Sequence, residues 1–362
     1  MVELADIFRQ YGPAYREKYG DKMLPSHRQA MADIEQCRTE ALGAHVYYCE
    51  QCDETHHCYH SCKNRHCPKC QGDAALEWLH KQQHLLLNVP HFMVTVTLPA
   101  ELRNVARLHQ KEVYNLLFRT SAAALQELAL DPRFVGGQIG MIGVLHTWTR
   151  DLLFHPHCHF LVPAGGISPD GHSWLPCRRK FLVRVEPLSD LFRGKFRDGL
   201  KKLGLYDQVP ASAWHKSWVV NSKPVGNGSQ ALTYLSRYLL RVAISNERIL
   251  SLDNDNVTFE YKESNTGKLK TRTLPAEKFI HRFLQHILPK GFVKIRYYGY
   301  LGTTKRAVLK QLRILLLMSN PVQQVDDSQN TLISSQAGIP CPKCGQLMRL
   351  VEVFRPKSRS PP

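Results

Sequence analysis

Closely spaced cysteines constrain this chain more than any other feature of its sequence. Seven of the eleven cysteines lie between Cys37 and Cys70, and two Cys-x-x-Cys motifs, Cys49/Cys52 and Cys67/Cys70, are separated by fourteen residues. Two such motifs can place four thiolates around one ion, and a tetrahedral four-thiolate site is typical of structural zinc. We therefore predict that these two motifs together bind one Zn²⁺ ion, in a small domain that needs the metal in order to fold.

Other side chains of zinc-ligand type surround the two motifs. They can hold a second ion if the ligand pairs interleave as in a cross-brace, so we expect one or two zinc ions. His56, His57 and Cys58 are alternative ligands. The residues assigned to the second ion are Cys37, His45, Cys62 and His66.

The composition points to a folded protein with a polyanionic partner. The formal net charge is +17 and the apolar content is 43%, so the chain can bury a core and its excess of cations favours nucleic acid as partner. No stretch approaches the roughly 20 apolar residues of a membrane span, and the N-terminus lacks the pattern of a signal peptide. We expect a cytoplasmic, nucleoid-associated protein with no membrane partner.

Hydrophobic periodicity predicts an α+β fold. Strands alternate with helices between residues 90 and 300, which favours a sheet layered with helices. Expected strands cover residues 92–98, 141–148, 157–163, 217–221, 257–261, 268–274 and 292–300. Expected helices cover residues 4–19, 26–36, 74–87, 104–130, 189–203, 230–244, 276–288 and 304–318. The tail from residue 319 is predicted to be flexible, except for segment 341–345. The motif Cys341/Cys344 in this segment is open to three interpretations: half of a zinc ribbon, a contact to a partner chain, or an incomplete site.

A histidine pair lies on one of the expected strands, in the sequence His155-Pro156-His157-Cys158-His159. Side chains alternate between the faces of a strand, so His157 and His159 point the same way and can share a metal ion. His155 has the same parity, but Pro156 at the start of the strand leaves its direction open. The alternative interpretation is a histidine-rich strand that binds nothing.

A tyrosine pair lies on the expected helix 230–244. Tyr234 and Tyr238 are four residues apart and so lie one helical turn from each other, with Arg237 and Arg241 alongside. These residues can be ordinary boundary side chains of an amphipathic helix. They can also act in concert, because a tyrosine hydroxyl can attack a DNA phosphodiester and form a phosphotyrosine while arginines bind the flanking phosphates.

Such a reaction requires a cation on the non-bridging phosphate oxygens. His157 and His159 would hold that cation, which we expect to be Mg²⁺ or Mn²⁺. Imidazole suits Mg²⁺ less well than carboxylate does, so a third ligand is expected. Gln230, one turn before Tyr234, and Asp151 are the candidates.

These motifs carry a family resemblance. The chain resembles the two-tyrosine rolling-circle insertion-sequence transposases of the HUH nuclease superfamily (insertion sequence ninety-one family). The resemblance covers residues 1–318 and rests on the cysteine-rich segment 37–70, on His157-Cys158-His159, on Tyr234 with Tyr238, and on segment 291–299. Cys158 stands where an aliphatic residue is commoner in the family, and the C-terminal tail matches weakly.

The resemblance implies four regions: a helical segment at 1–36, a zinc-binding domain at 37–72, an HUH catalytic domain at 73–318, and a tail at 319–362. The catalytic domain is then a ferredoxin-like antiparallel sheet with flanking helices, which carries the histidines on a central strand and the tyrosine helix beside it. The implied activity is metal-dependent nicking and strand transfer of single-stranded DNA at transposon ends and target, through 5′-phosphotyrosine intermediates and a free 3′-OH.

Three other functions are compatible with the same residues. A non-catalytic zinc-dependent DNA-binding protein would share the charge and the cysteines but give the histidines and tyrosines no common role. A metallohydrolase would use the histidine strand with water as nucleophile. A rolling-circle replication initiator would use the same chemistry as the transposase. The oligomeric state is left open, a homo-oligomer included.

Overall fold

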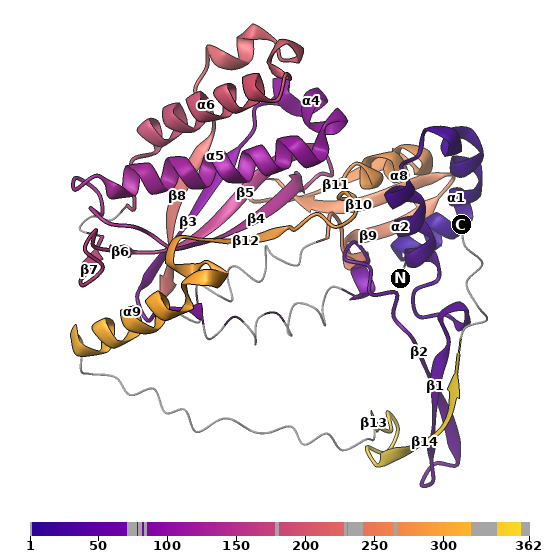
Figure 1. Ribbon diagram of the computed structural model, residues 1–362. Coiled ribbons are helices and arrows are strands. Elements are labelled where there is room, and N and C mark those ends of the chain that lie inside the picture. Colours follow the sequence, from indigo (N-terminus) through magenta and orange to yellow (C-terminus); the bar gives the residue numbers. More distant parts are fainter. Residues whose placement is uncertain are drawn as a thin grey trace.

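A computed structural model describes residues 2–70, 78, 82, 85–177, 181–227, 230, 242–263, 266–319 and 339–355 (Figure 1). Its largest sheet has five antiparallel strands in the order β12-β4-β5-β3-β8. The strands are β3 (Pro90–Thr97), β4 (Met141–Trp148), β5 (Phe154–Pro163), β8 (Val220–Asn227) and β12 (Ile295–Tyr298). The mixed helix-and-strand class predicted from the sequence is confirmed, and β5 is the central strand.

Three helices pack on one face of this sheet, which we call the helical face (Figure 1). They are α4 (Arg103–Leu108), α5 (Gln110–Leu130) and α6 (Val185–Lys202). Cys158 and Phe160 of β5 are fully buried there, and the Phe160 ring meets Phe118 of α5 edge to face. Gly143 of β4 leaves room for this ring, because a Cβ at that position would lie 2.7 Å from a Phe160 ring carbon.

The opposite face of the sheet is partly covered by α9 (Arg306–Ser319) (Figure 1). Ile142 and Leu161 pack there with Leu309 and Leu312 of that helix. The strand register places Ile142 against Leu161 and His146 against His157. Because alternate residues share a face, the apolar contact with α9 and the histidines of β4 and β5 lie on the same side of the sheet.

A second core joins the two halves of the chain. Helices α1 (Leu4–Tyr19) and α2 (Pro25–Glu35) share it with α8 (Ala276–Leu284) and with the sheet β11-β10-β9. Phe8 of α1 meets Phe283 of α8 with ring centroids 5.6 Å apart. The strands are β9 (Ile249–Asp253), β10 (Asn256–Lys262) and β11 (Leu269–Pro275). The helical segment at the N-terminus is therefore held by residues from the second half of the chain rather than by a core of its own.

A third sheet, in the order β13-β14-β1-β2, projects from these helices (Figure 1). Its strands are β1 (Ala44–Cys49), β2 (Glu54–Tyr59), β13 (Ile339–Pro340) and β14 (Leu347–Phe354). β14 pairs antiparallel with β1, from Ala44 against Phe354 to Tyr48 against Arg349. The prediction of a flexible tail is therefore wrong for residues 339–340 and 347–354, which form strands on either side of the Cys341/Cys344 motif.

Many element bounds agree with the periodicity of the sequence. Leu4–Tyr19 and Met141–Trp148 form α1 and β4 with the expected limits. The expected helix 104–130 is interrupted at His109, whose backbone leaves the helical region (φ −122°, ψ 53°), and so becomes α4 and α5. Most of the expected helices 74–87 and 230–244 lies outside the described residues.

Among the helices that the structure describes, no helix is both long and apolar enough to cross a membrane.

Candidate functional site

Three histidines come together on the sheet face opposite α5. His157 and His159 extend from β5, as their parity predicts, and His146 extends from β4 at the position that pairs with His157. One ring nitrogen of each histidine lies within 4.8 Å of those of the other two. The ring centroid of His146 lies 5.4 Å from that of His157 and 4.8 Å from that of His159. This arrangement can hold one metal ion.

His146 was not predicted as a metal ligand. Its strand was predicted, but the single sequence does not reveal that β4 pairs directly with β5 or in what register. One feature of the sequence could have identified His146 as a ligand. It lies on a buried strand at an even spacing from Ile142 and Val144, so the three side chains share one face of β4. Adjacent antiparallel strands place directly opposed side chains about 5 Å apart, close enough to share a ligand.

Hydrogen bonds orient the two β5 histidines. Nδ1 of His157 lies 2.7 Å from the His155 carbonyl oxygen, to which it can only donate. Its Nε2 then keeps a lone pair for a metal. Nδ1 of His159 lies 2.9 Å from Oγ1 of Thr95 on β3. The His146 ring stacks on Trp148, with centroids 4.8 Å apart.

Burial favours the uncharged form of His157 and His159. It lowers the pKa of His157, and burial followed by the neighbouring His157 lowers the pKa of His159 well below its usual value. Neutral imidazole is the form that binds metals. His155 is not part of the cluster, because its Nδ1 lies 3.1 Å from Nη2 of Arg103. Burial, His157 and Arg103, in that order, lower the pKa of His155 to about 4.

The two residues expected as third ligand have other surroundings. Asp151 forms an ion pair with Arg272 at 2.8 Å and lies outside the histidine cluster, so its assignment as a ligand is wrong. Gln230 is exposed, and its side-chain oxygen occupies the space where a Cβ on Gly226 would be. Its role as a ligand stays a prediction. The four predicted residues of the tyrosine helix, Tyr234, Arg237, Tyr238 and Arg241, lie outside the described residues.

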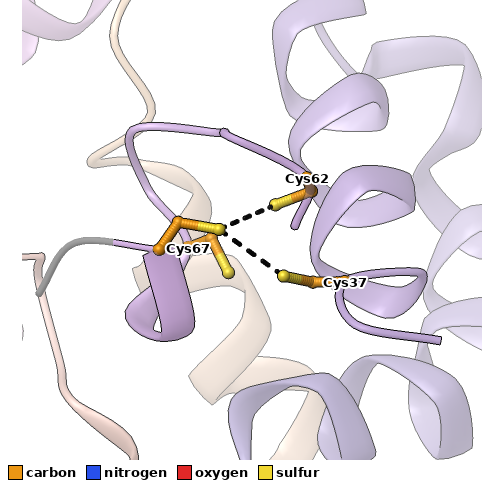
Figure 2. A group of neighbouring side chains, drawn as sticks. Cys37, Cys62 and Cys67 are labelled. Atoms are coloured by element: carbon orange, nitrogen blue, oxygen red, sulfur yellow. Dashed lines mark hydrogen bonds between the residues drawn. The ribbon is translucent and has the colours of Figure 1, made fainter. Parts of the chain in front are cut away.

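The structure regroups the cysteines. Cys37, Cys62, Cys67 and Cys70 form one four-sulfur cluster, in which Cys70 Sγ lies 3.5 Å from that of Cys37 and 3.6 Å from that of Cys62. Figure 2 shows Cys67 directed at both Cys37 and Cys62. Hydrogen bonds from Cys62 and Cys37 and from backbone amides lower the pKa of the Cys67 thiol despite its burial, which favours the thiolate that zinc binds.

The other motif, Cys49/Cys52, belongs to a second cluster with Cys341 and Cys344. The predicted pairing of Cys49/Cys52 with Cys67/Cys70 is therefore wrong. The physical reason is that β1 and β2 form a hairpin that carries the Cys49/Cys52 turn at its far end. Six residues of extended chain span about 20 Å, so this turn cannot share an ion with cysteines at the base of the hairpin.

The two histidines assigned to a second zinc are not ligands in either cluster. His66 is partly buried, and its Nε2 accepts a hydrogen bond from the Leu288 amide at 3.2 Å. His45 lies on β1, with its ring 4.7 Å from that of His60. Arg65, next to His66, donates to the carbonyl oxygens of Phe292 and Pro289. The zinc-ligating loop is thereby joined to the segment that leads into β12.

A basic cavity of about 260 Å³ opens beside the histidine strand. Its charged lining consists of cations from α4 and α8 and includes no carboxylate; the charged residues are Arg103, Arg107, Lys278 and Arg282. Arg103 also contacts His155, two residues before His157. The guanidinium of Arg107 lies 5.2 Å from the Phe154 ring centroid. These cations can bind a phosphate backbone next to the cluster, and none of them was predicted.

Comparisons with known proteins identify the family of the chain. Residues 140–308 match the family described as "Putative transposase", and residues 7–98 match the family described as "Transposase zinc-binding domain". The chain is 40% identical to "Putative transposase y4qJ" of Sinorhizobium fredii, over 97% of this chain and 95% of that protein. It is 29% identical to the transposase for insertion sequence element IS801 of Pseudomonas savastanoi pv. phaseolicola, over 74% of this chain and 68% of that protein. No solved structure matches the chain significantly. The chain therefore belongs to the IS91 family of insertion-sequence transposases, and its N-terminal part is a transposase zinc-binding domain.

Proposed function

We propose that this transposase nicks and rejoins single-stranded DNA at the ends of its element, with Tyr234 and Tyr238 as nucleophiles. The observation that carries the proposal is the cluster of His146, His157 and His159 on the centre of an antiparallel sheet. Family membership supports the transposase role. The sheet with helices on one face is compatible with the HUH-type, ferredoxin-like catalytic domain that the sequence resemblance implies.

The histidine cluster suits a divalent ion. A Mg²⁺ or Mn²⁺ ion bound there would polarise the scissile phosphate and offset the charge that develops on its oxygens. Three imidazole ligands suit Mn²⁺ better than Mg²⁺, which prefers oxygen ligands. The strands hold the three rings in place, and the hydrogen bonds of His157 to His155 and of His159 to Thr95 fix how the rings face the ion.

The tyrosines would carry out the covalent step. The hydroxyl oxygen of one tyrosine bonds to phosphorus while the bond from phosphorus to the 3′ oxygen breaks. The tyrosine proton ends on that oxygen, so the products are a 5′-phosphotyrosine and a free 3′-OH. The phosphotyrosine keeps the energy of the phosphodiester, so a 3′-OH from another DNA end can displace the tyrosine without ATP. Two tyrosines permit two successive transfers.

A metal-dependent adduct assay tests the proposal. The full chain is incubated with labelled single-stranded DNA that carries the element's end, with Mn²⁺, Mg²⁺ or EDTA, and run on a denaturing gel. We expect an adduct with either metal, at lower concentrations of Mn²⁺, and none with Tyr234→Phe/Tyr238→Phe. Cleavage without an adduct would indicate that water is the nucleophile. Binding without cleavage would indicate a non-catalytic zinc-dependent DNA-binding protein.

The basic cavity would bind the DNA backbone beside the scissile phosphate. Arg107 and Lys278 line it and have exposed side chains, so replacing them should not disturb the core. For Arg107→Ala/Lys278→Ala we expect weaker binding to single-stranded DNA and a smaller dependence of affinity on salt. The logarithmic slope should fall by about 0.7 for each phosphate that the variant no longer neutralises. Fluorescence anisotropy at several salt concentrations measures both the affinity and the slope.

A matched control is available on α6. Lys201 and Lys202 are also exposed, but they lie at the C-terminal end of α6 and do not line the cavity. Lys201→Ala/Lys202→Ala changes the net charge by the same amount, so it should leave the salt slope unchanged. If the two double variants had the same dependence of affinity on salt, the cavity would not be part of the DNA-binding surface.

A further inference from the structure

The two ends of the chain meet at the second cysteine cluster. Cys49 is the last residue of β1 and Cys52 lies in the turn that leads to β2, while Cys341 and Cys344 lie between β13 and β14. All four sulfurs lie within 4.8 Å of one another. The family match that describes a zinc-binding domain ends at residue 98, so it does not include the C-terminal pair.

The distances within the cluster fit a tetrahedral zinc site. A Zn–S bond of about 2.3 Å places the sulfurs of a tetrahedron about 3.8 Å apart. Here the sulfur of Cys49 lies 3.6 Å from that of Cys344, and the sulfur of Cys52 lies 3.9 Å from that of Cys341. All four are free thiols. His56 Nε2 lies 3.9 Å from the Cys341 sulfur but is not within the four-donor group.

The C-terminal motif has the backbone of a zinc-binding turn. The amides of Lys343 and Cys344 hydrogen-bond to the Cys341 sulfur. The Gly345 amide donates to the Cys341 carbonyl at 2.8 Å, and Gly345 has φ +78°, a conformation that favours glycine. The turn therefore directs both thiols to one side, where the turn between β1 and β2 supplies the other two.

Packing alone gives this sheet little support. Around the four cysteines, the described residues form an apolar cluster of only Cys49, Cys341 and Met348, with Tyr47 and Cys52 against it. Ala44 and Val46 of β1 are also buried, outside this cluster. Every residue of β14 except Met348 is exposed. A core of this size is too small to hold a strand without a cross-link or a metal.

We propose that Cys49, Cys52, Cys341 and Cys344 bind a second structural Zn²⁺ ion, which fastens the C-terminal strand β14 to the N-terminal zinc-binding domain. The ion completes a site whose two halves come from opposite ends of the chain. Pairing of β14 with β1 and the ion pair between Lys343 and Glu54 set the register of the two halves.

Zinc content and protease sensitivity test the proposal. We expect the purified full chain to contain two zinc ions, by mass spectrometry of the metal, and Cys341→Ser/Cys344→Ser to contain one. Trypsin should then cleave the variant after Lys343 and Arg349 at least tenfold faster than the parent chain. A chain that stops at residue 338 should also contain one zinc ion, which gives a second measurement independent of the serine substitutions.

Cys58→Ser is the matched control. Cys58 lies on β2 of the same sheet and is half-buried, but it belongs to neither cluster. This variant should keep two zinc ions and the parent's resistance to trypsin. One zinc ion in the parent chain, or two in either the serine double variant or the shortened chain, would overturn the proposal.

Discussion

Replacing His146 with alanine is expected to lower the rate of DNA adduct formation by at least about a hundredfold at limiting Mn²⁺, because loss of one of three ligands weakens metal binding. His146 is 3% exposed and lies opposite His157 across two hydrogen-bonded strands. Part of the rate should return at high Mn²⁺ concentration, since two histidines remain. The assay of adduct formation against metal concentration separates a weaker metal site from a damaged fold.

His155→Ala is the control for this prediction. His155 lies on the same strand and its ring is 5.8 Å from that of His157, yet it faces Arg103 rather than the cluster. Its loss should leave the metal concentration needed for half-maximal rate within about threefold of the parent value. If both variants needed the same higher metal concentration, the third ligand would have to be sought elsewhere, with Gln230 as the remaining candidate from the sequence.

Replacing Cys67 with serine should unfold the N-terminal zinc-binding domain. Structural zinc contributes about 10–16 kcal/mol in small zinc domains, whereas the whole stability of a domain is typically about 5–15 kcal/mol. Cys67 is directed at both Cys37 and Cys62 (Figure 2), so its loss removes the sulfur on which the cluster converges. We expect a loss of one zinc ion, together with rapid proteolysis of residues 2–70.

Cys177→Ser is the comparison for the Cys67 variant. Cys177 belongs to neither cysteine cluster, and its thiol donates to the Phe181 carbonyl, a bond that a serine hydroxyl can also make. This variant should keep its zinc and its protease resistance. Unchanged zinc content in Cys67→Ser would contradict the assignment of that cysteine as a ligand.

Local patterns in the sequence predicted much of the sheet that carries the site. The continuous apolar run at residues 141–148 and the alternation around His157 identify β4 and β5, because strand periodicity is a local property. The same parity placed His157 and His159 on one face. What local periodicity does not contain is strand order, and His146 became a candidate ligand only when β4 was seen beside β5.

The cysteine clusters also depend on strand pairing that the local sequence does not contain. The sequence identified them as zinc ligands but assigned partners by proximity along the chain. The true partners of Cys49 and Cys52 come from the C-terminus, and the hairpin that separates them from Cys67 and Cys70 was not predicted. The segment from Glu54 to Tyr59, with two adjacent histidines, lacks the apolar alternation that identifies a half-buried strand.

The meeting of β14 with β1 has a consequence for how the protein is made. Cys49 and Cys344 are separated by 295 positions, so all five strands of the largest sheet are synthesised before β14, the second strand that pairs with β1, exists. Contacts between such distant residues form late, because the intervening chain must first be ordered. Until then, the edge of β1 that pairs with β14 is exposed, and Cys49 and Cys52 lack the other two cysteines of their cluster. Completion of the sheet β13-β14-β1-β2 therefore marks a polypeptide that has been extended past β14, and a polypeptide that ends before Cys341 keeps that edge exposed.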